Sequence, residues 1–219
     1  MTQPPATEAE LLHRAAALAG RTLGELAQEL HFQAPPDLRG HKGWVGHLLE
    51  AALGASAGSK AEPDFPHLGV ELKSVPVDAS GVPIESTWVT VAPLDGTLER
   101  TWEASHVRAK LAAVLWVPVQ GSRDLLVPLR KIGTPVLWRP NAEQEALLRE
   151  DWEFHAEVIG LGELWQLDAR KGEALQVRPK GARGSDRVWA TDSDGERVAD
   201  TPRGFYLRRS FTRTLLAPG

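Results

Sequence analysis

The sequence predicts an α/β protein, and three observations support this class. Two stretches near the N-terminus, 7–19 and 22–30, combine helical periodicity with capping signals. Short apolar runs at 70–75, 87–92 and 114–119 are rich in the β-branched and aromatic residues typical of strands. The chain has 219 residues, 42% hydrophobic and 25% charged, as in an ordinary globular protein of one large domain or two lobes.

The N-terminal part is predicted to be helical. Thr7 with Glu10 forms a capping box for the first helix, and Thr22 with Glu25 repeats it for the second. A third helix is expected from about residue 43 to 53, with Glu50 close to its C-terminal end. A loop of small residues, 54–60, then leads toward Asp64 and lets backbone approach backbone or a phosphate closely.

The strand at 70–75 is predicted to pair with the strand at 87–92 as an antiparallel hairpin across a turn-rich connection. The apolar run at 114–119 is typical of a central strand. The other expected elements are a helix at 101–112, strands at 125–129 and 135–138, an acidic helix from Asn141 to about Val158, a hairpin of 161–168 with 173–178, a long loop at 179–202, a strand at 204–209 and a terminal helix capped by Ser210.

Composition excludes several classes of chemistry. The chain has no Cys, which excludes disulfides, thiol catalysis and Cys-ligated zinc, and suits a reducing cytoplasm. The N-terminus shows no secretory signal, and no apolar run reaches the roughly 20 residues needed to cross a bilayer. We therefore expect a cytoplasmic protein with no membrane partner.

Charge is unevenly distributed along the chain, although the net charge is only −4. Residues 170–213 contain eleven Lys and Arg against six Asp and Glu, whereas residues 140–168 contain eight acids and one Arg. A chain that is acidic overall can still present one basic face to a polyanion. A solvated surface of mixed charge is the alternative interpretation of the basic segment.

Asp64 is followed seven residues later by Glu71-x-Lys73 within an apolar run. Side chains alternate along a strand, so Glu71 and Lys73 should share a face while Leu72 points into the core. A turn containing Pro66 and Gly69 would return Asp64 to the side of Glu71. The alternative is an exposed, solvated Glu/Lys pair, because this spacing also arises by chance.

These residues suit a metal site for phosphodiester hydrolysis. Mg²⁺ prefers oxygen ligands, and Asp64, Glu71 and the backbone carbonyl of Leu72 would supply them, with Glu50 completing a second shell. Lys73 would stabilise hydroxide and the charge that builds on phosphorus. Other motifs compete weakly: the histidines lack zinc-protease spacing, and neither Gly-x-Ser-x-Gly nor Gly-x-Gly-x-x-Gly is present.

The basic C-terminal third has the composition of a DNA-contacting surface. Arg178-Pro-Lys180 lies where a strand enters a loop, and Arg and Lys are common readers of guanine. Tyr206 on the next strand could lay its ring against a base. Four arginines are better suited to phosphates, which position a protein on DNA without specifying sequence: Arg203, Arg208, Arg209 and Arg213.

Several motifs together resemble the MutH family of methyl-directed mismatch-repair endonucleases, within the PD-(D/E)xK restriction-endonuclease-like superfamily. The resemblance covers nearly the whole chain apart from 181–200. Its motifs are Lys42-Gly-Trp-x-Gly-x-Leu-Leu-Glu50, Leu53-Gly-Ala-Ser-Ala-Gly-Ser-Lys60, Leu68-Gly-Val-Glu71-Leu-Lys73, Trp102-Glu-x-Ser-His-Val-Arg-x-Lys110, Val114-Leu-Trp-x-Pro-Val119, Arg178-Pro-Lys180 and Pro202-Arg-Gly-Phe-Tyr206-Leu.

The resemblance implies a single endonuclease domain, 1–219, with a restriction-endonuclease-like mixed β-sheet flanked by helices and two lobes around a DNA cleft. The N-terminal lobe, roughly 1–100, would hold the catalytic residues and the C-terminal lobe, 101–219, the DNA-reading residues. It implies a monomer that uses Mg²⁺ to nick the unmethylated strand at hemimethylated GATC sites in double-stranded DNA. MutL, loaded by MutS at a mismatch, would activate it.

Residue roles follow from the same motif matches. The active-site residues would be Glu50, Asp64, Glu71 and Lys73, with Lys110 as a catalytic auxiliary. Lys42 would contact DNA, Arg178 and Lys180 would read bases, and Tyr206 would sense adenine N6 methylation. Two other functions stay open: a type II restriction endonuclease of the same fold, and a non-catalytic DNA-binding module.

Overall fold

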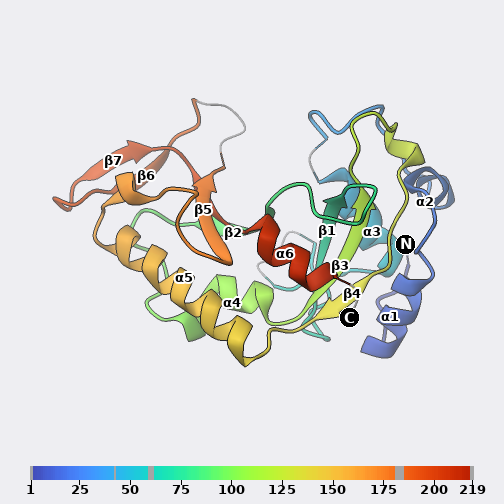
Figure 1. Cartoon of the computed structure of the whole chain (residues 1–219), viewed down its shortest axis with the longest axis horizontal. Coiled ribbons are helices and arrows are strands. Elements are labelled where there is room, and N and C mark those ends of the chain that lie inside the picture. Colours follow the sequence, from blue (N-terminus) through green and yellow to red (C-terminus); the bar gives the residue numbers. More distant parts are fainter. Residues whose placement is uncertain (1, 42, 59–61, 181–184, 218–219) are drawn as a thin grey trace. The chain divides into compact units, whose positions relative to one another are not determined.

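The computed structural model describes residues 2–41, 43–58, 62–180 and 185–217. The chain folds into two compact units (Figure 1). Unit 1 comprises Met1–Ile84, Ala112–Arg139 and Leu215–Gly219, and unit 2 comprises Glu85–Leu111 and Pro140–Thr214. The chain therefore passes repeatedly from one unit to the other, and the units do not follow a single boundary near residue 100.

Unit 1 combines helices with a mixed three-stranded sheet. Its elements are α1 (Glu8–Ala16), α2 (Leu23–Glu29), α3 (Trp44–Leu53), β1 (Glu71–Val77), β3 (Val114–Gln120), the 3₁₀ helix η2 (Val127–Leu129) and β4 (Val136–Trp138). The strand order is β1-β3-β4. β1 runs parallel to β3, and β4 runs antiparallel to it. The predicted mixed sheet with flanking helices is confirmed in this unit.

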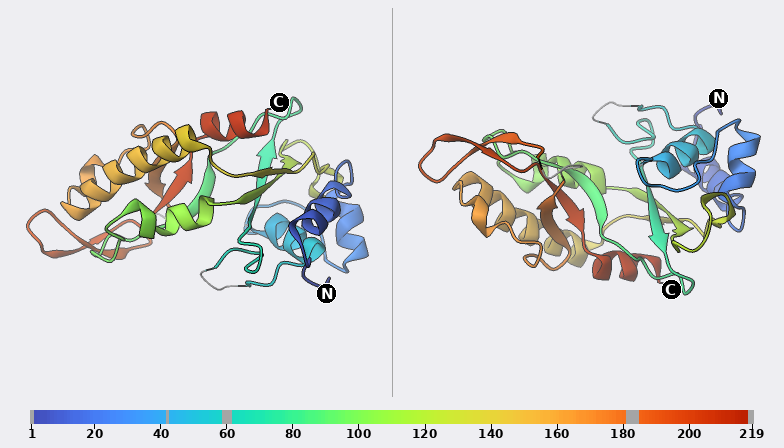
Figure 2. Two further views of the ribbon diagram at one scale, coloured as in Figure 1. Left: turned by 90° about the horizontal axis from the view of Figure 1, so that it is seen from below. Right: turned by 90° about the horizontal axis from the view of Figure 1, so that it is seen from above.

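The core of unit 1 lies between the helices and one face of this sheet. Leu72 of β1 and Leu115 and Val117 of β3 join Leu11 of α1 and Leu48 of α3 in one buried apolar cluster. Figure 2 shows the blue-to-cyan helices grouped beside these strands from two directions. Because strand side chains alternate, the residues on either side of Leu72 point away from this core.

Unit 2 is built around a separate antiparallel sheet of order β2-β8-β5. Its elements are β2 (Thr87–Ala92), η1 (Trp102–Ala104), α4 (His106–Leu111), α5 (Ala142–Gly160), η3 (Leu164–Gln166), β5 (Leu175–Pro179), β6 (Val188–Thr191), β7 (Arg197–Asp200), β8 (Arg203–Leu207) and most of α6 (Arg209–Leu216). The buried rings of Trp102 and Trp152 pack in its interior, with their centroids 6.0 Å apart.

Capping side chains mark the starts of α2 and α5, whereas the predicted cap Ser210 lies within α6. Thr22 and Glu25 form both bonds of a capping box at the start of α2, and Asn141 and Gln144 form another at the start of α5. The predicted helices at 7–19, 22–30, 43–53 and 141–158 are thus confirmed within a few residues. Across the described residues, no helix is long and apolar enough to span a membrane.

The predicted hairpin of 70–75 with 87–92 is wrong. β1 pairs in parallel with β3, from Glu71 opposite Val114 to Val77 opposite Gln120, while β2 pairs with β8 in the other unit. Five of the seven β1 residues are buried and the other two are half-buried, the pattern of a strand covered on both faces as parallel strands are. A turn at 78–82 folds only residues 83 and 84 back onto the end of β1, where Ile84 N donates to Pro76 O (3.0 Å).

Four other expectations are corrected. The helix at 101–112 is interrupted, because the Ser105 side chain accepts a bond from Arg108 N (3.1 Å) and starts α4 separately from η1. Pro128 places 127–129 in the 3₁₀ helix η2 instead of a strand. Residues 164–166 also form a 3₁₀ helix, so 173–178 pairs with β8 and not with 161–168. The loop at 179–202 contains the β6–β7 hairpin.

Candidate active site

Asp64 is brought back to β1 by a short turn. Phe65 N donates to Val70 O (2.9 Å) and Val70 N donates to Phe65 O (3.3 Å), so the two residues pair across it. Gly69 has φ +65°, a conformation that glycine adopts at little cost. Leu72 N then donates to Asp64 Oδ2 at 2.8 Å. The predicted return of Asp64 to the start of this strand is confirmed.

The edge of β1 places the Leu72 carbonyl on the same side as the Asp64 carboxylate. Glu71 N donates to Ala113 O (2.9 Å) on the β3 side. In a strand, the N–H and C=O of one residue point to the same side, and the next residue points to the other side. The N–H and C=O of Leu72 therefore both face the free edge, where Asp64 already bonds the N–H.

Glu71 and Lys73 form a buried ion pair on the face of β1 opposite Leu72. Lys73 Nζ lies 3.2 Å from Glu71 Oε1, and each side chain is only 8% exposed. The alternative of an exposed, solvated pair is therefore wrong. Removing two charges from water is costly unless they are paired, so this ammonium is held close to the carboxylate.

Glu50 stands near both of the other carboxylates. Its side chain is half-buried on α3, one helical turn after Gly46. Burial raises the pKa of Glu50, and the charges of Asp64 and Glu71 raise it further, against a smaller opposite effect of His47. The three carboxylates thus share one electrostatic environment.

The donor set that suits a divalent cation combines side chains and backbone. As the described side chains stand, no three Asp, Glu, His or Cys residues are grouped closely enough to hold one ion. Asp64, Glu71 and the Leu72 carbonyl supply oxygen atoms from the first residues of one strand and the turn before it. Oxygen donors of this kind fit Mg²⁺, which keeps several waters as additional ligands.

The predicted base-reading residues lie together on the sheet of unit 2. Arg178 on β5 and Tyr206 on β8 are close, with the guanidinium carbon 5.6 Å from the ring centroid. Arg178 also donates to Ser86 Oγ at 2.7 Å. Lys180 follows β5 directly, and its N–H donates to Pro202 O (2.7 Å). The structure therefore brings Arg178, Lys180 and Tyr206 to one sheet.

Trp88 is a central member of this surface that the sequence did not reveal. Lys180 Nζ lies 3.9 Å from the Trp88 ring centroid, and Tyr206 contacts the same indole edge-on at 5.2 Å. The indole lies over Gly204, where an added Cβ would be 2.0 Å from the ring. A useful signal was present, since a glycine within a strand often marks the close approach of another group.

Burial shifts the pKa of two groups on this surface. The pKa of Lys180 is lowered by desolvation, as expected for an ammonium held on an indole. The pKa of Tyr206 is raised chiefly by desolvation, so its hydroxyl stays a hydrogen-bond donor at neutral pH. Cations and rings are thus already ordered in the protein alone.

The remaining predicted residues lie elsewhere. Lys110 is half-buried on α4 of unit 2, so unit 1 does not itself contain it. Lys42 lies outside the described residues. Arg203 donates to Leu167 O (3.0 Å), and Arg208 donates to Ala169 O and Lys171 O (2.9 and 3.0 Å). These guanidinium groups use some of their donors on the protein's own backbone, and their assignment to phosphates stays a prediction.

Fold and site together define a mixed α/β protein with an acid–lysine site on one sheet and a cationic, aromatic surface on another. Residues 53–151 match the family model described as DNA mismatch repair enzyme MutH. The chain is 53% identical to the DNA mismatch repair protein MutH of Serratia proteamaculans over 214 residues, 98% of this chain and 94% of that protein. MutH of Escherichia coli (strain K12 / DH10B) is 52% identical over 217 residues, 99% of this chain and 95% of that protein.

A third relative, MutH of Pasteurella multocida, is 52% identical over 212 residues, which cover 97% of this chain and 96% of that protein. The matched lengths span both the acid–lysine site and the sheet that carries Arg178 and Tyr206. The chain belongs to the MutH family.

Proposed function

We propose that this protein is a Mg²⁺-dependent endonuclease of DNA mismatch repair that nicks the unmethylated strand at hemimethylated GATC sites. The single observation that carries the proposal is the buried Glu71–Lys73 pair beside Asp64 at the start of β1. This arrangement supplies carboxylates and an ammonium at one strand end, the groups that phosphodiester hydrolysis requires. Membership of a family of DNA mismatch repair proteins supports the choice of DNA as substrate.

Asp64, Glu71 and the Leu72 carbonyl would hold the Mg²⁺ ion, with Glu50 beside them. When bound, Mg²⁺ supplies Lewis-acid polarisation of a phosphoryl oxygen and a lower pKa for water. A bound cation would lower the pKa of Glu50, because it would offset the mutual repulsion of the three carboxylates.

Lys73 would stabilise the negative charge that develops on phosphorus. Its ammonium is already fixed 3.2 Å from Glu71, so little reorganisation is needed when substrate arrives. Lys110 is proposed as an auxiliary cation, and Lys42 as a phosphate contact. Both assignments rest on their place in the family motifs.

Arg178 and Lys180 are proposed to read guanine through its major-groove acceptors. The adenine N6 methyl group also lies in the major groove, and Tyr206 is proposed to sense it by contact. Trp88 and Arg178 both pack on the Tyr206 ring, which limits its freedom to move away from a methyl group. Arg209 and Arg213, both exposed, remain candidates for phosphate contacts.

The remaining parts of the proposal come from the family resemblance. They are a restriction-endonuclease-like fold, DNA bound in a cleft between two lobes, activation by MutL after MutS binds a mismatch, action as a monomer and a cytoplasmic location. Each stays a prediction.

A supercoiled plasmid containing GATC sites tests the proposal directly. The plasmid is prepared unmethylated, hemimethylated and fully methylated, and is incubated with the protein and Mg²⁺. We expect nicked circles from the first two substrates and none from the third. EDTA should abolish nicking of both substrates.

The two alternative functions give different products. A type II restriction endonuclease of the same fold would cut both strands and give linear plasmid without a helper. A non-catalytic DNA-binding module would give no product with the native protein or with Glu71→Ala. The close pairing of Glu71 with Lys73 favours catalysis, because a binding surface has no need of a buried ion pair.

A further inference from the structure

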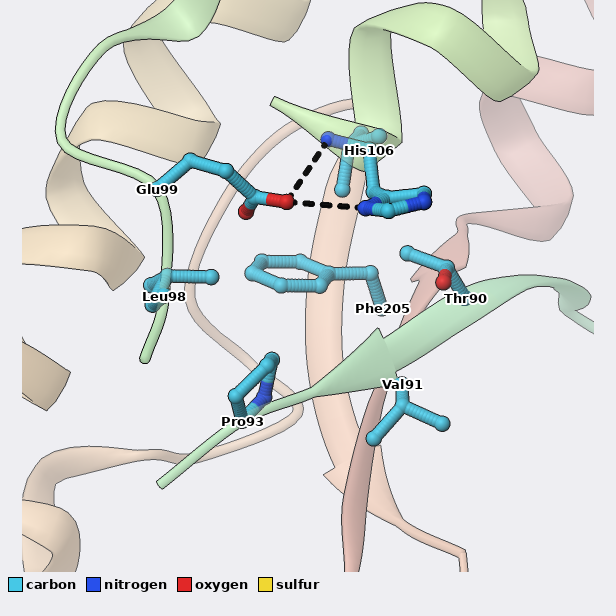
Figure 3. A pocket seen from close by; sticks show the side chains of 8 residues that line it. Thr90, Val91, Pro93, Leu98, Glu99, His106 and Phe205 are labelled. Carbon is cyan, nitrogen blue, oxygen red and sulfur yellow. Dashed lines mark hydrogen bonds and ion pairs between the residues drawn. The ribbon is translucent and has the colours of Figure 1, made fainter. Parts of the chain in front are cut away.

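A recess lies in unit 2, away from the groups described so far (Figure 3). It has a volume of about 200 Å³ and is lined by apolar side chains that include Val91, Pro93, Leu98 and Phe205. Phe205 is fully buried beneath it, whereas Val91 is half exposed at its edge. Sites for small-molecule cofactors usually measure about 300–1,000 Å³, so this recess fits a single side chain better.

The recess carries one acidic group. Glu99 Oε1 accepts bonds from His106 Nδ1 (2.9 Å) and His106 N (3.3 Å), and both residues line the recess. In Figure 3 these bonds reach only one oxygen of the Glu99 carboxylate. Within the described chain, Oε2 is thus left available for a donor that enters the recess. The carboxylate also makes the recess unsuitable for a DNA phosphate.

We propose that this recess binds an arginine side chain of a protein partner. The apolar walls would cover its aliphatic stem, because long cationic side chains lay their methylene groups along apolar surface. Glu99 Oε2 would accept the charge-assisted hydrogen bond from the guanidinium. Lysine is a poorer fit, because its compact ammonium is strongly hydrated and lacks the planar, forked donor geometry that matches a carboxylate.

The position of the recess connects it with the base-reading surface. Phe205 and Tyr206 are consecutive on β8, so their side chains point to opposite faces of the sheet. Thr90 pairs with Phe205 and also lines the recess, while Trp88 pairs with Tyr206 on the other face. A partner's arginine would therefore sit behind the strand that carries Tyr206. An effect of the bound partner on base reading would rest on the proposed function. Binding of the arginine itself does not.

The test uses N-acetyl-arginine methylamide as the probe and N-acetyl-citrulline methylamide as its uncharged isostere. Both are titrated into the full-length protein while NMR follows the side chains of Val91, Leu98, His106 and Phe205. We expect saturable shifts with the arginine probe, half-complete in the millimolar range, and at least tenfold weaker binding of the citrulline probe. Glu99→Gln should weaken arginine binding to the citrulline level, whereas Glu103→Gln, outside the recess, should not.

Equal binding of the two probes would overturn the proposal, as would shifts that survive Glu99→Gln or no shifts at tens of millimolar. A second variant, Leu98→Trp, fills the recess without changing its charge and should also abolish binding. The titration contains no DNA. Its failure is therefore independent of whether the protein nicks GATC sites.

Discussion

At the scale of single residues, Glu71 and Lys73 show why the acid–lysine site is expected to be active. Both side chains are nearly excluded from water, yet they lie at the start of an edge strand beside Asp64. Low solvent exposure strengthens the interaction of each charge with a substrate phosphate. The pair is thus suited to catalysis more than to stability, because buried ion pairs often add little to stability.

Replacing Glu71 with Gln keeps the shape of the side chain and removes its charge. We expect nicking in Mg²⁺ to fall by roughly 10²–10³-fold, because a preorganised electrostatic group is lost. DNA binding, measured by fluorescence anisotropy, should change little. Glu150→Gln, on the exposed face of α5, is the matched control and should nick normally. A Glu71→Gln enzyme with normal nicking would exclude Glu71 from the site.

The ionisation of Glu50 makes the stability of the metal-free protein depend on pH. Its pKa is raised in the folded protein by burial and by Asp64 and Glu71, so ionised Glu50 destabilises the metal-free fold. The loss of stability begins as the pH rises through the pKa that Glu50 has in the unfolded chain. It is complete above the raised pKa that Glu50 has in the folded protein.

We therefore predict that Glu50→Gln raises the Tm in EDTA at about pH 8 but changes it little at about pH 4, where both side chains are neutral. Mg²⁺ should then raise the Tm of the native protein more than that of the variant. A lower Tm for Glu50→Gln in EDTA at the higher pH would contradict the proposed crowding of carboxylates. Differential scanning calorimetry provides the measurement.

Tyr206→Ser tests the reading of methylation. The substitution removes the ring but leaves Arg178 and Lys180. The ratio of nicking at hemimethylated sites to nicking at fully methylated sites should therefore fall by a larger factor than the rate of nicking at hemimethylated sites. The measurement is kcat/KM on the two substrates. Equal losses on both would rule out a sensing role and leave Tyr206 as a packing residue beside Trp88.

Only part of the site could be predicted from sequence. The approach of Asp64, Glu71 and Lys73 follows from a short turn and from strand alternation, which are local properties. The contacts of Trp88 with Lys180 and Tyr206 depend on the pairing of β2 with β8, which are far apart in sequence. No local signal fixes that register, so Trp88 was missed.

At the scale of elements, the entry into β5 is held by a buried carboxylate. Asp151 of α5 is 6% exposed and accepts bonds from the backbone N–H groups of Glu173, Ala174 and Leu175 at 2.6–3.0 Å. Arg208 bonds backbone carbonyls on the same turn. These two side chains fix the start of the strand that carries Arg178 three residues later.

Asp151→Ala should therefore destabilise the protein by about 3 kcal/mol, because a charged acceptor is lost and buried N–H groups are left without a partner. Urea unfolding measures the change. Asp151→Asn, which keeps one acceptor oxygen, should lose less, and the exposed neighbour Glu150→Ala should lose almost nothing. A loss below about 1 kcal/mol for Asp151→Ala would show that β5 is held by its pairing with β8 alone.

Element type was predicted more successfully than element pairing. Capping residues such as Thr22 and Asn141 act within one turn, so the sequence reveals them directly. The partner of β1 is β3, which follows it only after the chain has formed β2, η1 and α4 in unit 2. Such a crossover is decided by tertiary packing and not by the residues that flank the strand.

At the scale of the whole molecule, the residues proposed for chemistry and those proposed for recognition lie in different units. Unit 1 contains Glu50, Asp64, Glu71 and Lys73, and unit 2 contains the sheet that carries Arg178 and Tyr206. The interleaved chain joins the two units by several covalent connections. Under the proposed function, cleavage at a defined position in a GATC site would require both units to act on one DNA molecule.

The most direct test of this account is strand-specific mapping of the product. A duplex with one hemimethylated GATC site carries a different fluorophore on each strand, and the products formed in Mg²⁺ are sized on a denaturing gel. We predict one nick, 5′ to the G of the unmethylated strand, that is absent with Glu71→Gln. Cleavage of both strands, or nicking of the methylated strand, would contradict the account.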